Sequence, residues 1–511
     1  MNEIAIGVEA LTEQQVLAVA RHDARVRLSD EARKAITASR DIIEALAGDP
    51  EPHYGISTGF GALATKQIAP GDRVALQRSL IRSHAAGSGP EVEREVVRAL
   101  MLLRLSTLAT GRTGIRLETA ETYAAMLNAG ITPVVYEFGS LGCSGDLAPL
   151  AHCALAAMGE GTVRVGGDVL PAADALAAAG ITPVVLREKE GLALTNGVDG
   201  MLGMLTLAIH DLAMLFRTAD LGAAMSVEAQ LGTDAVFAAD LQALRPHPGQ
   251  ADSAANLRAL LAGSAIMASH RTGDCTRVQD AYSLRCSPQV HGAGRDTLAH
   301  ARLVRDRELA SAVDNPVVTL DGRVESNGNF HGAPVGYVLD FLAVVAADLA
   351  SIAERRTDRF LDKARNHGLP PFLADDPGVD SGYMIAQYTQ AAQVSELKRL
   401  AVPASVDSIP SSAMQEDHVS MGWSAARKLR RAIDALTQVL AIEILTAARA
   451  LDLRAPLTPA PATAAARDAL RQQVAGPGPD RYLAPDIAAT VELVRSGRLI
   501  AAAEAVCGPL R

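Results

Sequence analysis

The sequence predicts a mainly α-helical protein, in which a bundle of long helices follows a mixed α/β N-terminal domain. The first observation is composition: aromatic residues make up only 3% of the 511 residues, and Ala and Leu, which favour helices, are frequent. The second is the stretch 424–453, which lacks Gly and Pro and has apolar residues every three or four positions. The third is that turn residues divide the first 205 residues into short segments.

These patterns predict two domains, residues 1–205 and residues 206–511. The first alternates helical stretches with short extended segments bounded by turn residues. From residue 206 onward long helical patterns dominate, and helices of this length pack as bundles. In the stretch 424–453 one apolar stripe is expected to be buried against neighbouring helices: Leu429, Ile433, Leu436, Leu440 and Ile444.

Two long segments in the helical part are rich in Gly, Pro, Asn and Asp, namely 314–334 and 364–382. Loops of this length inside a compact protein are usually functional. We therefore expect them to form walls or lids of an active site.

Charge and cysteine content argue against several classes of protein. The net charge is −10 and the basic residues are dispersed, which disfavours a nucleic-acid partner. No basic segment followed by an apolar one opens the sequence, and charged residues interrupt the most apolar stretches, so neither a secretory signal nor a membrane span is expected. Five cysteines without a C-x-x-C pair predict no metal site and a cytoplasmic location.

The segment GSLGCSGDLAPLAH at 139–152 surrounds one serine with glycines. A serine hydrolase elbow requires G-x-S-x-G, and Asp146 stands where the second glycine should be. A hydrolase that uses Ser144 or Cys143 as its nucleophile is therefore an alternative with weak support. A purely structural alternative is a tight turn before a helix that Asp146 caps.

The triplet Cys143-Ser144-Gly145 can also build an electrophile. A five-membered ring closes if the amide nitrogen of Gly145 attacks the carbonyl carbon of Cys143 and water is lost, and glycine allows this close approach because it has no Cβ. Loss of a second water from Ser144 then converts its side chain into an exocyclic methylidene. No standard side chain is electrophilic, so such a group would extend the chemistry open to the protein.

This segment resembles the signature of the aromatic amino acid lyases, in which such a triplet forms a methylidene-imidazolone. Further family motifs occur in family order over nearly the whole chain: HYGISTGFG (53–61), LIRSHAAGSG (80–89), EGLALTNG (190–197), RVQDAYSLRCSPQVHGA (277–293), DNP (314–316) with NGNFHG (327–332), and PASVDSIPSSAMQEDHVSMG (403–422). The resemblance implies a fumarase/aspartase-like helix bundle whose N-terminal domain carries the prosthetic group. It also implies no metal, no dissociable cofactor, and a homotetramer with active sites shared between subunits.

Within the family, the sequence most resembles members that act on histidine. The resemblance implies non-oxidative deamination of L-histidine to trans-urocanate, the first step of histidine degradation. Phenylalanine-directed relatives have Phe-Leu in place of Ser83-His84, tyrosine-directed ones have His-Leu, and both typically have Gln in place of Glu416. The polar set suits an imidazole, because a carboxylate accepts a ring N–H and a histidine donates or accepts.

The resemblance also assigns roles residue by residue. Either of two tyrosines can be the base, and attack on the prosthetic group by the substrate amine or by its imidazole both stay open. The implied catalytic residues are Cys143, Ser144, Gly145, Tyr54 and Tyr282. The implied substrate-binding residues are Ser83, His84, Asn196, Gln279, Arg285 (on the carboxylate), Phe330 and Glu416.

Three alternatives stay open beside this prediction. The nearest is a tyrosine or phenylalanine ammonia-lyase, or a 2,3-aminomutase, of the same family, which would differ only in pocket residues and in the fate of the ammonia. The others are the hydrolase and a helical scaffold without catalytic activity.

Overall fold

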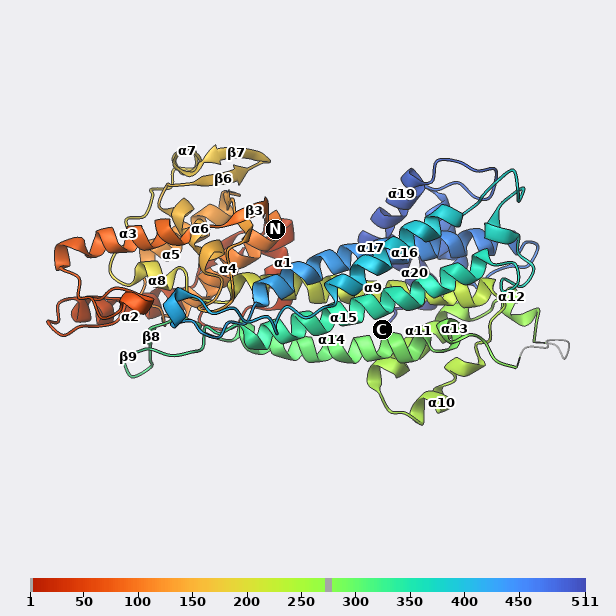
Figure 1. Cartoon of the computed structure of the whole chain (residues 1–511), viewed down its shortest axis with the longest axis horizontal. Coiled ribbons are helices and arrows are strands. Elements are labelled where there is room, and N and C mark those ends of the chain that lie inside the picture. Colours follow the sequence, from red (N-terminus) through yellow and green to blue (C-terminus); the bar gives the residue numbers. More distant parts are fainter. Residues whose placement is uncertain (1–2, 272–277) are drawn as a thin grey trace. The chain divides into compact units, whose positions relative to one another are not determined.

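The computed structural model describes residues 3–271 and 278–511, and it confirms the mainly α-helical prediction (Figure 1). Strands are few and short in the described chain. They form a parallel pair of β1 (Ile4–Ile6) with β2 (Val26–Leu28) and three antiparallel sheets. The antiparallel sheets are β3 (Ser88–Glu91) with β5 (Tyr136–Phe138), β4 (Thr132–Pro133) with β6 (Thr162–Val165) and β7 (Asp168–Pro171), and β8 (Val317–Val318) with β9 (Val324–Glu325).

The chain divides into two compact units, and each unit consists of three separate segments. Unit 1 comprises Met1–Leu207, Arg302–Asp340 and Pro403–Arg427. Unit 2 comprises Ala208–Ala301, Phe341–Val402 and Lys428–Arg511. The domains 1–205 and 206–511 stay a prediction, because a division into compact units does not show which parts of the chain fold independently.

Unit 1 combines all of these small sheets with short helices. Local signals set several helix starts: Thr12 forms a capping box with Gln15 before α1, and the Ser29 hydroxyl accepts the Ala32 N–H before α2. The helices that lie wholly in unit 1 are α1 (Glu13–His22), α2 (Asp30–Ala47), α3 (Arg73–His84), α4 (Arg94–Ala109), α5 (Leu117–Asn128), α6 (Leu147–Ala157), α7 (Ala172–Ala178) and α8 (Glu190–Ala193), with 3-10 turns at Gly61–Leu63, Pro70–Asp72 and Ser412–Met414.

Helix α4 is the core of unit 1, since every residue from Val96 to Ala109 is buried. Its fully buried Arg104 donates to the carbonyl oxygens of Ala193 (3.1 Å), Asn196 (2.6 Å) and Val313 (3.1 Å). A buried guanidinium requires such partners, because its desolvation is costly. Arg104 thereby fixes the loop after α8 and the start of the 314–334 loop.

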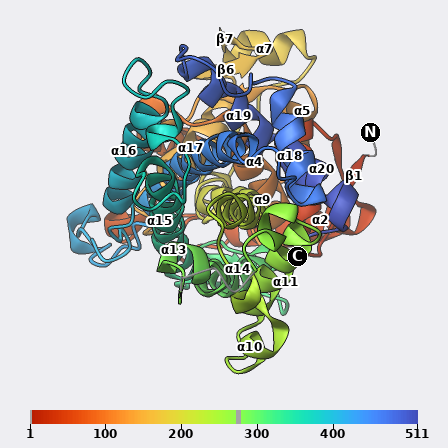
Figure 2. The ribbon, with the colours of Figure 1, turned by 90° about the vertical axis from the view of Figure 1, so that its right-hand side faces the viewer.

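Unit 2 is a bundle of long helices that run side by side, with α9 in the middle (Figure 2). Every residue of the chain from 218 to 230 is buried. Four of its helices also contribute residues to unit 1: α9 (Asp199–Ala229), α14 (Ser287–Leu309), α15 (Ala333–Leu361) and α17 (Gly422–Leu453). The others are α10 (Ala239–Ala243), α11 (Pro248–Leu261), α12 (Ala265–Ala268), α13 (Tyr282–Arg285), α16 (Met384–Leu400), α18 (Pro461–Arg471), α19 (Ala484–Arg495) and α20 (Arg498–Cys507), with 3-10 turns at Ala235–Phe237 and Pro371–Leu373.

The predicted helix at 424–453 is confirmed as α17, which begins two residues earlier, at Gly422. The five residues of its predicted apolar stripe are each at most 5% exposed. The spacing of apolar residues therefore identified a core face correctly.

Among the residues that the structure describes, two helices, α9 and α15, are long and apolar enough to cross a membrane by length and composition. In each helix, most of the 18-residue stretch that is most apolar is buried within the protein, as in a core helix of a folded protein.

A buried ion pair joins α15 to α17 inside unit 2. Arg356 Nε lies 2.5 Å from Glu443 Oε1, and both side chains are fully buried. Glu443 also accepts the hydroxyl of Ser226 at 2.9 Å, so α9 takes part in the same contact.

We expect Glu443→Ala to lower the free energy of unfolding by about 3–5 kcal/mol, because it leaves the Arg356 charge buried without its partner. Asp434→Ala, on the same helix, is the matched control, since Asp434 and Arg495 form an exposed ion pair. Urea unfolding followed by circular dichroism measures both. Equal midpoints for the two variants would contradict the expected role of the buried pair.

Candidate active site

A pocket of about 630 Å³ lies in unit 1 and is lined by several stretches that are far apart in the sequence. The stretches come from the loop after α2, the end of α3, the loop before α6, the loop after α8, the 314–334 loop and the segment before α17. Of the predicted site residues, the pocket is lined by Tyr54, His84, Cys143, Ser144, Asn196, Phe330 and Glu416.

The loop that carries the triplet requires glycine at two positions. Gly142 has φ +65° and Gly145 has φ +88°, values that other residues rarely adopt. A Cβ on Gly145 would lie 2.1 Å from the carbonyl oxygen of Gly197. The adjacent Asp146 N–H donates to that oxygen at 2.7 Å. The loop therefore packs directly against the backbone at 197, and Ser144 faces the pocket.

Asp146 anchors this loop to the start of α9 and does not cap α6. Its buried carboxylate accepts the N–H groups of Gly200 and Met201, both at 2.9 Å, and the hydroxyl of Ser140 at 2.9 Å. Burial raises the pKa of Asp146 to about 7. The alternative in which Asp146 caps the following helix is therefore wrong: its carboxylate makes no capping bond to α6.

Ser144 and Glu416, separated by 272 positions, form a hydrogen bond. The Ser144 hydroxyl donates to Glu416 Oε1 at 3.1 Å, and the Ser411 hydroxyl donates to Oε2 at 3.2 Å. Burial, together with the Glu416 carboxylate, raises the pKa of the Cys143 thiol to about 12. The raised pKa disfavours a hydrolase that uses Cys143 as its nucleophile, because the thiol stays protonated at neutral pH and the thiolate is the reactive form.

His84 ends α3 and lines the pocket, whereas Ser83 is not among the lining residues. The Ser83 oxygen lies 3.1 Å from His84 Nδ1, and its hydroxyl also contacts the Leu80 carbonyl oxygen at 3.0 Å. Ser83 thus contacts the histidine that faces the pocket. Partial burial lowers the pKa of His84 below its ordinary value of 6.5, so its imidazole is neutral at pH 7.

Backbone and amide contacts hold two other predicted residues in place. The Tyr54 hydroxyl oxygen accepts the Gly61 N–H at 3.2 Å. Asn196 donates to the Asn315 carbonyl oxygen at 3.0 Å, and the Asn327 N–H donates to Asn315 Oδ1 at 3.0 Å. The 314–334 loop is thereby joined to the loop after α8.

The 314–334 loop lines the pocket, as predicted, while 364–382 belongs to unit 2. In the 314–334 loop, Asn315, Asn327 and His331 also line the pocket, although the sequence patterns predict no individual role for them. Their position inside the motifs DNP and NGNFHG was the available signal. The ring of His331 stacks on His418 with centroids 5.7 Å apart, and His418 lines the pocket too.

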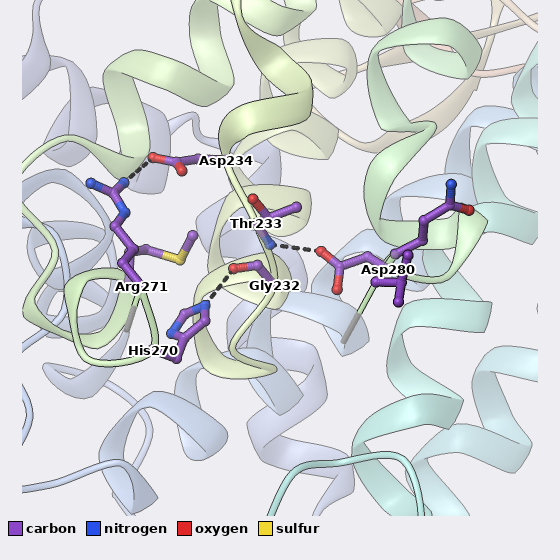
Figure 3. A pocket seen from close by; sticks show the side chains of 9 residues that line it. Gly232, Thr233, Asp234, His270, Arg271 and Asp280 are labelled. Atoms are coloured by element: carbon purple, nitrogen blue, oxygen red, sulfur yellow. Dashed lines mark hydrogen bonds and ion pairs between the residues drawn. The ribbon is translucent and has the colours of Figure 1, made fainter. Parts of the chain in front are cut away.

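Three predicted residues, Gln279, Tyr282 and Arg285, belong to unit 2 and are not among the residues that line this pocket. Tyr282 is 71% exposed, and the Arg285 guanidinium lies 4.7 Å from the centre of its ring. Gln279 lines a smaller pocket of about 210 Å³ in unit 2 (Figure 3). The first residue of their motif, Arg277, lies outside the described residues.

The lining of the pocket mixes apolar side chains, such as Leu80, Leu192 and Phe330, with polar ones. No group of three or more His, Cys, Asp or Glu side chains is placed to hold a metal ion in residues 3–271 and 278–511. The ionisable and hydroxyl side chains of the pocket include Ser144, Tyr54, three histidines (His84, His331 and His418) and two carboxylates (Glu416 and Asp417).

Comparison with known proteins decides the family. The aromatic amino acid lyase family model matches residues 11–472. The chain belongs to the aromatic amino acid lyase family. Histidine ammonia-lyase of Streptomyces avermitilis is 68% identical over 512 residues, with both chains covered completely.

Solved structures of this family share the fold. Histidine ammonia-lyase of Trypanosoma cruzi has a TM-score of 0.91 at 37% identity and covers 99% of this chain and 96% of its own. Tyrosine aminomutase of Streptomyces globisporus has a TM-score of 0.94 at 39% identity, and both chains are covered completely. The family fold therefore serves more than one reaction, and the pocket residues have to distinguish them.

Proposed function

We propose that this aromatic amino acid lyase is a histidine ammonia-lyase, which converts L-histidine to trans-urocanate and ammonia. The observation that carries the proposal is the pairing of Glu416 with Ser144, 3.1 Å apart, in a pocket that His84 also lines. A carboxylate and a neutral imidazole beside the reacting position suit a substrate with a polar ring. The identity of 68% to a histidine ammonia-lyase, against 39% to a tyrosine aminomutase, supports the same choice.

The residues at 143–145 fit a methylidene-imidazolone. Gly145 lacks the Cβ that would collide with Gly197, and its neighbour Ser144 lines the pocket, so a group formed there would face the substrate. When formed, this group supplies the electrophile that standard side chains lack. Asp146 holds the loop against α9 through two backbone N–H groups.

The remaining chemistry belongs to side chains of this chain. Glu416 accepts the imidazole N–H of the substrate, and His84 donates or accepts on the same ring. Tyr54 or Tyr282 removes the proton from the β-carbon, a role that contributes about 10²–10⁴ in rate for a positioned general base. Arg285 pairs with the substrate carboxylate through its planar guanidinium.

The direct test is product analysis with the purified protein and L-histidine. We expect ammonia and urocanate in equal amounts. Formation of a β-amino acid without net release of ammonia would identify an aminomutase instead. Deamination of tyrosine or phenylalanine in place of histidine would identify a different ammonia-lyase.

Activity is expected to rise from neutral to alkaline pH, because a tyrosinate base and an uncharged substrate amine are both favoured there. His84 does not oppose this trend. Its pKa is lowered by burial, so it stays neutral throughout that range and protonates only below its ordinary value of 6.5. The pH profile of kcat/KM measures the trend, and a maximum below about pH 6 would contradict both assignments.

We also propose a homotetramer in which Gln279, Tyr282 and Arg285 complete the site of another subunit. The exposure of Tyr282 and the separate location of these three residues in unit 2 support the idea.

The shared site predicts complementation between two inactive variants, Tyr54→Phe and Arg285→Ala. Mixed tetramers of the two should regain up to about one quarter of the parent activity, since an intact site then draws each residue from a different subunit. Co-expression followed by an assay of the purified tetramers measures this. No recovery in demonstrated mixed tetramers would contradict a site shared in this way.

The proposed setting is the cytoplasm, without nucleic-acid or membrane partners. The four described cysteines are all free, and Cys275 lies outside the described residues. Free thiols suit a reducing compartment. The dispersed basic residues and net charge of −10 support the absence of a nucleic-acid partner.

A further inference from the structure

A turn at the end of α9 is held by side chains that precede and follow the segment 272–277. Asp280 Oδ2 accepts the Thr233 N–H at 2.6 Å. His270 Nε2 lies 2.7 Å from the Gly232 carbonyl oxygen, and Arg271 Nη2 lies 2.5 Å from Asp234 Oδ2. Figure 3 shows these three contacts converging on residues 232–234. Residues 232–234 therefore contact the chain both before and after residues 272–277, at His270, Arg271 and Asp280.

Backbone hydrogen bonds fix the conformation of this turn. The Gly232 N–H donates to the Val227 carbonyl oxygen at 2.8 Å, and the Leu231 N–H donates to the Glu228 carbonyl oxygen at 3.1 Å. Together with the left-handed backbone of Leu231 (φ +52°), these bonds form a Schellman motif that ends α9. Because the last turns of α9 are fully buried, the motif offers Asp280 a fixed donor.

The chain just after Asp280 is held by a second, independent contact. The Ser283 carbonyl oxygen, in α13, accepts from Arg356 Nη1 at 3.3 Å, and the Ser287 oxygen lies 3.2 Å from the same atom. Arg356 is in turn fixed by its buried pair with Glu443. The backbone around Tyr282 is therefore held on both sides: by Asp280, two residues before it, and by Arg356 at Ser283, one residue after it. Arg285, at the far end of α13, lies beyond the second contact.

The side chains next to Asp280 contrast with it in burial. Asp280 is 8% exposed, whereas Tyr282 is 71% exposed and Val278 is 95% exposed. Because the Asp280 side chain is buried and hydrogen-bonded while its neighbours are exposed, it can fix the position of the backbone in this stretch. Its carboxylate accepts from a backbone N–H, a charge-assisted bond that fixes backbone position strongly.

We propose that Asp280 is a positioning residue for deamination, which sets the backbone that carries Gln279 and Tyr282 by binding the Thr233 N–H. This inference depends on the proposed function, because it assigns Asp280 a part in the same reaction. Displacement of a reacting group by about 1 Å can cost about 10²-fold in rate. Loss of the contact should therefore slow the chemical step. Arg285 lies beyond the contact with Arg356, so its binding of the substrate carboxylate should change little.

The test compares Asp280→Ala, Asp280→Asn and the parent enzyme in steady-state kinetics with L-histidine. We expect Asp280→Ala to lower kcat about 10²-fold with KM changed only a few-fold. Asp280→Asn keeps an oxygen acceptor without the charge, so its kcat should fall by only about threefold to tenfold. The control is Asp240→Ala, an exposed aspartate in α10 that also accepts a backbone N–H, and its kcat should equal that of the parent.

Intact mass and circular dichroism accompany the kinetics. The triplet lies in unit 1, so all variants should show the same loss of two waters as the parent, and their helical spectra should match. If Asp280→Ala does not fold, the Asn variant carries the test by the drop in kcat stated above. Unchanged kcat in either folded variant, or an Asn variant as poor as the Ala variant, would overturn the positioning role. A parent enzyme inactive on histidine would overturn the proposed function instead.

Discussion

Ser144→Ala is expected to abolish nearly all deamination of histidine and to change the mass of the purified protein. The parent chain should be lighter than its sequence by about 36 Da, the mass of two waters, because the cyclisation and the dehydration are covalent. The alanine variant has no hydroxyl to eliminate, so its deficit should not exceed about 18 Da, one water. Intact-mass spectrometry and a urocanate assay measure the two effects.

The helical spectrum of Ser144→Ala should match that of the parent, because the altered side chain faces a pocket and packs no core. An active parent protein with its full, undiminished mass would contradict the prosthetic group. Full activity in the alanine variant would contradict it equally.

Glu416→Gln is expected to lower kcat/KM for histidine by about 10² or more, because charge-assisted hydrogen bonds are roughly twice as strong as neutral ones and the substitution also removes an anion from the site. The variant keeps size and shape, so the comparison isolates the charge. Unchanged histidine kinetics in this variant would contradict the role of the carboxylate.

The pair Ser83→Phe with His84→Leu should shift substrate choice further. It replaces the polar end of α3 with apolar side chains, so a polar imidazole loses partners and an apolar ring gains contacts. We expect a large fall in kcat/KM for L-histidine and weak turnover of L-phenylalanine. Since Ser83 contacts His84 and does not line the pocket itself, Ser83→Ala alone should have a smaller effect than His84→Leu alone.

The helices were predictable because their signals are local. Between Leu429 and Ile444 an apolar residue of the predicted stripe recurs every three or four positions, and this spacing alone identifies the buried face of α17. The two compact units were less accessible to prediction. Unit 1 takes in 302–340 and 403–427. The loop composition of 314–334 marks a break in the helical pattern, but it does not reveal that this part of the chain packs with the N-terminal residues.

Motifs, and not spacing, predicted which distant residues line one pocket. Ser144 and Glu416 lie 272 positions apart, and only the resemblance to a family placed both in one pocket. Asp146 shows the limit of local reasoning: its position before α6 suggested a cap, but its carboxylate binds the first turn of α9, more than fifty residues away. Such contacts depend on tertiary packing, which a local sequence window does not contain.

The central claim is that this pocket selects histidine, and the kcat/KM values of the purified enzyme for L-histidine, L-tyrosine and L-phenylalanine test it most directly. A site built to hydrogen-bond a polar ring rejects an apolar one because its own buried groups stay unpaired, which is worth roughly 10⁴-fold or more. The account predicts that kcat/KM for histidine exceeds the other two by about that factor. Comparable values for histidine and tyrosine, or for histidine and phenylalanine, would contradict it.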